Sequence, residues 1–174
     1  LSIEKGSYPL FEGSEWATGE YFNRRGYKTE RWNELREAVE NGGMRNGYLM
    51  AVAPNGSTAV IAGTTASIDP IFKIKYTEEK KDYRGTSIAP DLDKGLRWFY
   101  KTAYNLDQHW TIKQNAARQR HIDQSQSCNL YVDKAIKASE LLALHMAAWN
   151  SKMKTTYYVR STSIELDECE SCSS

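Results

Sequence analysis

Residues 48–58 read Tyr-Leu-Met-Ala-Val-Ala-Pro-Asn-Gly-Ser-Thr, and this stretch decides the expected fold. Its first six residues, 48–53, are nearly all apolar and end before a proline, which is typical of a strand buried on both faces of a parallel sheet. Two later runs have a similar character, Cys128-Asn-Leu-Tyr-Val132 and Thr155-Thr-Tyr-Tyr-Val159. Helical patterns lie between these runs, and strands that alternate with helices favour parallel βα units. The sequence therefore predicts an α/β fold.

Helical and hairpin patterns account for most of the remaining chain. After Thr29 as N-cap, a helix is expected to bury Trp32, Leu35 and Val39 on one stripe and to end at Gly42-Gly43. The other expected elements are the last turn of a helix over residues 1–5, a loop over 7–28, a hairpin over 71–88, and helices over 92–104, 111–120 and 134–150, the last capped by Asp133.

The chain has the size of one ordinary globular domain, with 174 residues of which 40% are hydrophobic. Because a chain of this length can bury a core, we predict one domain over residues 1–160 and a flexible tail over 161–174. Its 23 basic and 22 acidic residues are interspersed and leave a net charge of +1. This balance argues against nucleic acid as a partner.

The sequence also bears on the cellular compartment. No apolar run approaches the roughly 20 residues that a membrane span needs, so no membrane partner is expected. Three unevenly placed cysteines are too few for a secreted disulfide framework, which predicts a cytoplasmic protein. Because the sequence starts at Leu1 rather than at methionine, we expect a fragment or a processed piece of a longer protein.

The loop after the first predicted strand has the residue types of an oxyanion cradle. It consists of Pro54, Asn55, Gly56, Ser57 and Thr58. The glycine lets backbone N–H groups turn toward a ligand, the two hydroxyls are further donors, and the small residues that follow can begin a helix with its positive end at the loop. Phosphate can bind such a loop without a lysine. Asn-Gly-Ser is also a common turn sequence, so these residues alone leave a plain turn open.

Two thiols near the end of the sequence, Cys169 and Cys172, are predicted to perform redox chemistry on a mobile arm. A disulfide between them would close too short a loop to stabilise the fold much. Thiol–disulfide exchange is favoured by a flexible carrier that reaches two partners, although we expect the nearby acidic residues to raise rather than lower the pKa of both thiols. Half of a zinc site is the alternative. The three histidines lack the paired spacing of zinc ligands, so no metal site is expected.

The adjacent tyrosines Tyr157 and Tyr158 lie in the third predicted strand. Two neighbouring phenols would suit stepwise proton-coupled electron transfer. Side chains of a strand alternate between its faces, so the rings can stack only where the strand ends or is distorted, and we predict that it does so here. The alternative is that both residues are present only because tyrosine favours strands and packs well.

Cys128 has no cysteine near it in sequence and is predicted to be a small core residue.

Several longer motifs occur together and in a distinctive order. They are Leu1-Ser-Ile-Glu-Lys-Gly-Ser-Tyr-Pro9, Phe11-Glu-Gly-Ser14, the stretch from Met44-Arg-Asn-Gly-Tyr-Leu-Met-Ala-Val-Ala-Pro-Asn-Gly-Ser-Thr-Ala59 through Ile61-Ala-Gly-Thr-Thr-Ala-Ser-Ile-Asp-Pro70, Ala117-Arg-Gln-Arg-His-Ile-Asp-Gln-Ser-Gln-Ser127, Lys154-Thr-Thr-Tyr-Tyr158, and the dicysteine tail. Together they resemble the carboxy-terminal portion of the large subunit of class I ribonucleotide reductases. The resemblance covers essentially the whole chain, and it implies the closing part of a ten-stranded α/β barrel with a flexible carboxy-terminal tail.

This resemblance implies a role for each candidate residue. Pro54–Thr58 would line the diphosphate of the substrate. Tyr158, on the side of the small subunit, and Tyr157, on the side of the active-site cysteine, would pass a radical between them. Cys169 and Cys172 would reduce the active-site disulfide after each turnover.

The same resemblance implies the partners of the chain. These are a ribonucleoside diphosphate substrate, a small subunit that contains a metal and supplies the radical, and thioredoxin or glutaredoxin, with no cofactor bound by this chain. The family's thiyl-forming cysteine lies upstream of this region, so an amino-terminal remainder of the large subunit is expected too. Two alternatives stay open, a non-catalytic nucleotide-binding or thiol-adaptor module and the equivalent part of a cobalamin-dependent class II reductase. The adjacent tyrosines favour class I.

Overall fold

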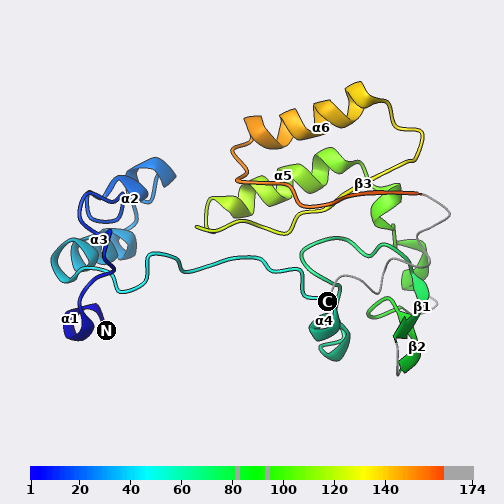
Figure 1. Cartoon of the computed structure of the whole chain (residues 1–174), viewed down its shortest axis with the longest axis horizontal. Coiled ribbons are helices and arrows are strands. Elements are labelled where there is room, and N and C mark those ends of the chain that lie inside the picture. Colours follow the sequence, from blue (N-terminus) through cyan, green and yellow to red (C-terminus); the bar gives the residue numbers. More distant parts are fainter. Residues whose placement is uncertain (81–82, 93–94, 163–174) are drawn as a thin grey trace. The chain divides into compact units, whose positions relative to one another are not determined.

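The computed structural model describes residues 1–80, 83–92 and 95–162 (Figure 1). These residues divide into two compact units, Leu1–Met50 and the part that starts at Ala51, and each is described by itself. Helices and short strands are both present, in agreement with an α/β fold. Within the described ranges, no helix has the length and apolar character that crossing a bilayer requires.

The first unit is helical. It contains α1 (Ser2–Lys5), α2 (Glu20–Arg25) and α3 (Glu30–Gly42). Helix α3 begins after Thr29 and ends before Gly43, as predicted. Gly43 has a φ of 68°, a left-handed value that ends helices and that glycine adopts without strain.

Two predictions for this unit are wrong. Residues 7–28 are not loop throughout, because α2 forms there and buries Phe22. The expected burial of Leu35 with Trp32 does not occur, and the Leu35 side chain is 43% exposed. The reason is that the rings that pack against α3, those of Phe22 and Tyr27, meet Trp32 instead, and the Tyr27 ring stacks on it at a centroid distance of 4.1 Å.

The second unit is organised around one extended segment, residues 125–132, which we call the central segment. Strand β3 (Leu130–Val132) pairs in parallel with β4 (Val159–Ser161). Just upstream, Gln126 forms an isolated parallel bridge with Val52. The central segment therefore has a parallel neighbour at both ends, and the predicted parallel pairing of the three runs is confirmed at these contacts.

Two helices pack on β3 and form the core with it. Helix α5 (Gln108–Gln119) and helix α6 (Ala138–Asn150) run side by side next to the strand (Figure 1). The apolar residues of each helix recur at helical spacing and therefore lie on one face. These two faces meet in the core. The buried core residues are Ile112, Cys128, Leu130, Val132, Leu144, Ala148 and Met153.

The predicted strands are longer than the observed ones. Residues 48–53 form no strand, because only Val52 finds a ladder partner, and Tyr48 and Leu49 are 74% and 56% exposed. The run from Cys128 becomes regular only at Leu130. The run 155–159 lies almost entirely before β4, which starts at Val159. A strand needs a ladder of bonded residues rather than an apolar composition alone.

Other elements differ in their bounds. The hairpin predicted over 71–88 is present as β1 (Lys75–Lys80) and β2 (Tyr83–Ile88), which pair antiparallel. The helix predicted over 92–104 is wrong. Two short 3-10 turns are described there, Leu96–Trp98 and Ala103–Asn105, because Trp98 and other apolar side chains stay exposed rather than packing a helix onto the core.

The last two predicted helices are present with shifted starts. Helix α5 begins three residues before Thr111, because the Asp107 side chain accepts the His109 N–H and acts as N-cap. Helix α6 begins at Ala138 rather than at 134. Asp133 caps only a preceding turn, through the Ala135 N–H.

Candidate functional site

The tyrosine pair lies directly before β4. The Tyr157 N–H donates to the Cys128 carbonyl at 2.8 Å, and the Tyr158 carbonyl accepts the Leu130 N–H at 2.9 Å. Regular strand structure starts only at Val159, so the predicted interruption of the strand at the tyrosines is confirmed. The two rings contact each other, with centroids 4.1 Å apart and planes inclined at 50°.

The hydroxyl groups of the pair are also in contact. The Tyr157 hydroxyl donates to the Tyr158 hydroxyl over 3.5 Å, and both side chains are about half exposed. Because the neutral phenol donates this bond, the bond raises the pKa of Tyr157 above its ordinary value. The Arg160 guanidinium carbon is 5.6 Å from the centre of the Tyr158 ring, within cation–π range. The pair thus offers two phenols in contact and a proton path between them.

A buried carboxylate and a buried amide connect to the tyrosines. Asp69 accepts the Asn129 N–H at 3.3 Å and the Asn129 Nδ2 at 2.5 Å, and Asn129 Oδ1 accepts the Tyr158 N–H at 3.1 Å. Asp69 and Asn129 are each only 5% exposed. Burial raises the pKa of Asp69, while the hydrogen bonds from Asn129 oppose that rise.

Cys128 is enclosed in the core. It is fully buried, and desolvation raises the pKa of its thiol to about 12. A thiol with this pKa stays protonated at neutral pH and is a poor nucleophile. Its predicted role as a core residue is therefore confirmed.

The loop Pro54–Thr58 is exposed and leads into α4 (Ser57–Ile61). The Asn55 N–H donates to the Ala53 carbonyl at 3.0 Å, and Gly56 accepts the N–H of Ala59 at 3.1 Å. A helix has no carbonyl of its own for the N–H groups of its first turn. The loop thus combines a turn with N–H donors at a helix start, and both the turn and the phosphate interpretations fit it.

Ser67 joins this loop to the central segment. Its N–H donates to the Asn55 carbonyl at 3.4 Å, and its hydroxyl lies 2.6 Å from the Ser127 hydroxyl. The Val52 N–H donates to the Ser125 carbonyl at 3.2 Å. The tyrosine pair is therefore bonded directly to residues 128–130, and the phosphate-loop candidate is linked to Ser127 through Ser67.

Gln108 holds a second junction at the start of α5. Its Nε2 donates to the carbonyls of Ala103 and Leu106 at 2.9 and 3.0 Å, and its Oε1 accepts the Tyr131 N–H at 3.0 Å. The side chain is 6% exposed. It fixes the chain before α5 to β3.

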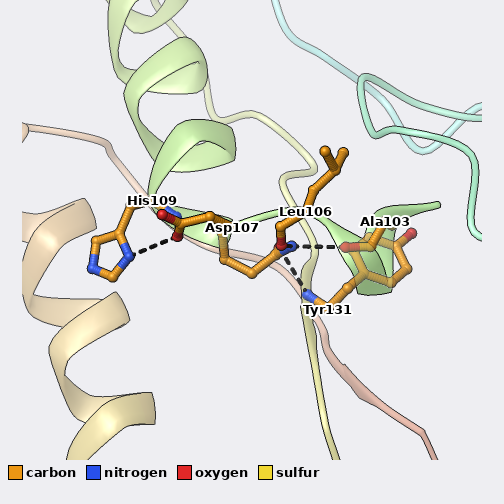
Figure 2. Close-up of polar contacts among 6 residues, drawn as sticks. Ala103, Leu106, Asp107, His109 and Tyr131 are labelled. Carbon is orange, nitrogen blue, oxygen red and sulfur yellow. Dashed lines mark hydrogen bonds and ion pairs between the residues drawn. The ribbon is translucent and has the colours of Figure 1, made fainter. Parts of the chain in front are cut away.

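A cavity of about 450 Å³ opens beside this junction, with Asp107, Asp133 and Glu140 in its lining. Asp107 accepts both the backbone N–H and the ring Nδ1 of His109 at 2.9 Å (Figure 2). The backbone bond and then the ring bond lower the pKa of Asp107. Both acceptor bonds serve the start of α5, so the carboxylate acts as a helix cap.

The two tail thiols, Cys169 and Cys172, lie outside the described residues. The dithiol thus remains a sequence-based prediction. Among the residues that are described, no group of three or more His, Cys, Asp or Glu side chains is arranged to hold a metal ion.

Sequence reasoning missed Asp69, Asn129 and Gln108 as connecting residues. A signal existed for Asn129, a polar residue inside the apolar run 128–132. Buried polar side chains are expected to be hydrogen-bonded, so an amide in such a run predicts a specific partner. The sequence did not reveal that the partners are Asp69, 60 residues away, and the Tyr158 N–H.

Comparison with known proteins gives a consistent result. The sequence model of "Ribonucleotide reductase, barrel domain" matches residues 1–159. The chain is 49% identical over 174 residues to the ribonucleoside-diphosphate reductase subunit alpha of Treponema pallidum, covering 100% of this chain and 21% of that protein. It is 40% identical over 182 residues to the protein of that name from Helicobacter pylori strain J99, covering 97% of this chain and 23% of that protein. The chain thus spans about a fifth of the length of these relatives.

Solved structures contain the fold as well. The class Id ribonucleotide reductase alpha subunit of Actinobacillus ureae aligns with a TM-score of 0.56 and 22% identity. The alignment covers 97% of this chain and 38% of that one. At this identity the likeness supports the α/β fold.

Proposed function

This chain belongs to the ribonucleotide reductase barrel-domain family, and from that membership we propose that it is the carboxy-terminal segment of a class I ribonucleoside-diphosphate reductase large subunit. In this proposal the complete subunit reduces ribonucleoside diphosphates to deoxyribonucleoside diphosphates by radical chemistry. The observation that carries the proposal is the contacting pair Tyr157 and Tyr158, with ring centroids 4.1 Å apart.

The pair acts as a radical relay in this proposal. A small subunit that contains a metal oxidises Tyr158, which gives up one electron and its hydroxyl proton to that subunit. An electron then passes from Tyr157 to the Tyr158 radical, and the Tyr157 hydroxyl proton moves to the Tyr158 oxygen along the bond between the two hydroxyls. Tyr157, now the radical, oxidises the active-site cysteine in the amino-terminal remainder of the subunit.

The loop Pro54–Thr58 holds the substrate diphosphate. Support comes from its exposure, from the start of α4 at Ser57, and from the hydroxyls of Ser57 and Thr58. N–H groups at a helix start point outward and attract anions. Ser67 links this loop to Ser127, in the same stretch of backbone to which the tyrosines bond.

The tail dithiol closes the cycle. The thiolate of one tail cysteine, Cys169 or Cys172, attacks the active-site disulfide to give a mixed disulfide. The second tail thiol resolves it, which leaves the site reduced and the tail oxidised. Thioredoxin or glutaredoxin then reduces the tail. The support here is the sequence alone.

The remaining parts of the proposal follow from the family. In this proposal the described residues are the closing part of a ten-stranded α/β barrel, residues 1–160 belong to that domain, and residues 161–174 carry the redox dithiol. The exposed apolar side chains of Tyr48, Leu49 and Met50 suit a surface that the remainder of the barrel covers. We expect a cytoplasmic enzyme, with no cofactor bound by this segment.

The test uses the complete large subunit with its small subunit and a thiol reductant. Tyr158→Phe removes the oxidisable hydroxyl, so deoxynucleotide formation should fall at least a thousandfold while the substrate still binds. Tyr48→Phe is the matched control, since it removes the same hydroxyl from a tyrosine outside the relay, and it should keep wild-type turnover. Full turnover by Tyr158→Phe would reject the relay.

Separate variants test the loop and the tail. Ser57→Ala with Thr58→Ala should raise KM for the diphosphate and change kcat little, since uniform binding is lost. Cys172→Ser should allow a single turnover by the pre-reduced enzyme but block continued turnover with thioredoxin or glutaredoxin. An unchanged KM in the first case, or continued turnover in the second, would contradict the assigned role.

A further inference from the structure

A chain of buried hydrogen bonds runs from Asp69 to the backbone of Tyr158. Both Asp69 carboxylate oxygens accept from Asn129, one from its N–H at 3.3 Å and one from its Nδ2 at 2.5 Å. The other end of the amide, Oδ1, accepts the Tyr158 N–H at 3.1 Å. Asp69 and Asn129 are each 5% exposed, so water is a poor substitute for these partners.

The partners allow only one orientation of the Asn129 amide. A carboxylate accepts hydrogen bonds, and a backbone N–H donates them. The amide must therefore turn its NH₂ toward Asp69 and its oxygen toward Tyr158. If Asp69 offered a donor instead, the amide would have to turn its NH₂ toward the Tyr158 N–H, and two donors would face each other.

Asp69 also belongs to the segment that leads away from the exposed loop. Ser67, two residues earlier, bonds through its N–H to Asn55 and through its hydroxyl to Ser127. The loop, the central segment and the tyrosines are thus linked through Ser67 and Asp69. Of these, Asp69 is the one whose bonds lead on to Tyr158.

We propose that Asp69 is a positioning residue for the radical relay, acting through Asn129 to fix the backbone of Tyr158 and so the contact of its ring with Tyr157. The inference rests on the proposed function and adds a residue to it. Tyr157 is held separately, by its N–H bond to the Cys128 carbonyl. The Tyr158 carbonyl also accepts the Leu130 N–H, so loss of the Asp69 chain releases the N–H side of Tyr158 and shifts its ring relative to that of Tyr157.

An exchange of the two side chains tests this proposal in the complete large subunit with its small subunit. Asp69→Asn leaves one oxygen for two Asn129 donors, and Asn129→Asp places two carboxylates together. Each single variant should lower kcat about tenfold or more, because small misplacements of reacting groups are costly, while KM for the diphosphate changes less than twofold. In the double variant, the amide introduced at position 69 can donate to the carboxylate introduced at position 129. That carboxylate can still accept the Tyr158 N–H, so kcat should recover most of the loss.

A spectroscopic measurement separates positioning from general stability. With 3-aminotyrosine at position 158, the yield of the trapped radical in the presence of substrate should fall in Asp69→Asn and recover in the double variant. Asp107→Asn is the matched control, because it makes the same exchange of side chain at the cap of α5 without touching Asn129. It should lower the thermal midpoint and leave the radical yield at the wild-type level.

The outcomes decide between the two proposals. Wild-type kcat and radical yield in Asp69→Asn would overturn the positioning role, as would a folded double variant with no recovery. Where Asp69→Asn does not fold, the double variant and its radical yield decide alone. If Tyr158→Phe keeps full turnover, the relay itself fails. If Tyr158→Phe is inactive and Asp69→Asn is normal, only the role of Asp69 fails.

Discussion

Residues 48–53 and residues 128–132 are both short apolar runs, yet they differ sharply in burial. In the second run Cys128 and Leu130 are completely buried, and β3 has a parallel neighbour and two helices against it. In the first run Leu49 is 56% exposed, and Val52 forms a single isolated bridge. The difference shows that an apolar run becomes a buried strand only where other parts of the chain cover it.

The proposed function offers an explanation for the run that lacks its cover. The chain spans 21% and 23% of the length of two relatives, and in the proposed function the rest of the large subunit completes the barrel. Helices α5 and α6, which cover β3, lie within this chain. The cover of residues 48–53 would then come from polypeptide outside it.

The largest expected contrast is in stability. Leu130→Ala should lower the free energy of unfolding by about 2–5 kcal/mol, since it leaves a cavity in a packed core. Leu49→Ala should change it by less than about 0.5 kcal/mol, as surface substitutions do. Urea denaturation of the purified chain measures both. A similar loss in the two variants would break the comparison.

Thiol labelling should sharpen the same contrast. In a background with Cys169→Ser and Cys172→Ser, iodoacetamide at pH 8 should modify Leu49→Cys at least about a hundred times faster than Cys128, whose pKa is raised to about 12 by burial. Mass spectrometry of the labelled peptides gives both rates. Comparable rates would show that the chain around Cys128 opens as readily as residues 48–53.

A smaller effect concerns the junction between the two regions. Ser67→Ala removes the hydroxyl contact with Ser127 and should lower the free energy of unfolding by about 1 kcal/mol. Hydrogen exchange at the Ser127 amide, which donates to Val52, should speed up more than exchange at Leu130. Equal acceleration at both amides would mean that the two regions open together.

The smallest effect is expected at the helix that covers β3. The pKa of Asp107 is lowered by its bonds from His109, so its ionised form stabilises the folded state above the ordinary carboxyl pKa of about 4. This contribution is lost as the pH falls through the lowered pKa. Asp107→Asn keeps a capping oxygen without the charge, so thermal midpoints of the two proteins should differ at pH 7 and converge near pH 3. A gap that widens on acidification would contradict the assignment.

The features that could be predicted from sequence depend on local chemistry. The start of α3 after Thr29 and its end at Gly43 follow from capping rules. The interruption of the strand at Tyr157 follows from the alternation of strand side chains. The resemblance pointed to the correct family, because several motifs had to occur in one order.

The features that could not be predicted depend on distant contacts. The helical pattern over 92–104 gives only short 3-10 turns in the described residues, since Trp98 and Phe99 meet no core. Residues 48–53 fail as a strand for the same reason. In the candidate site, the individual residues of the loop and the tyrosine pair could be named, but the Asp69 to Asn129 contact joins residues 60 positions apart.

That contact has a consequence for the order in which the molecule assembles. Asn129 reaches Tyr158 across 29 residues but reaches Asp69 across 60. Closing the longer loop costs about 0.6 kcal/mol more in chain entropy, since the length roughly doubles. During folding, the pairing with β4 should therefore form ahead of the docking of residues 67–69. In the native protein the contact made by residues 67–69 should be the first to open transiently. The most frequent fluctuations would then occur near the exposed loop Pro54–Thr58.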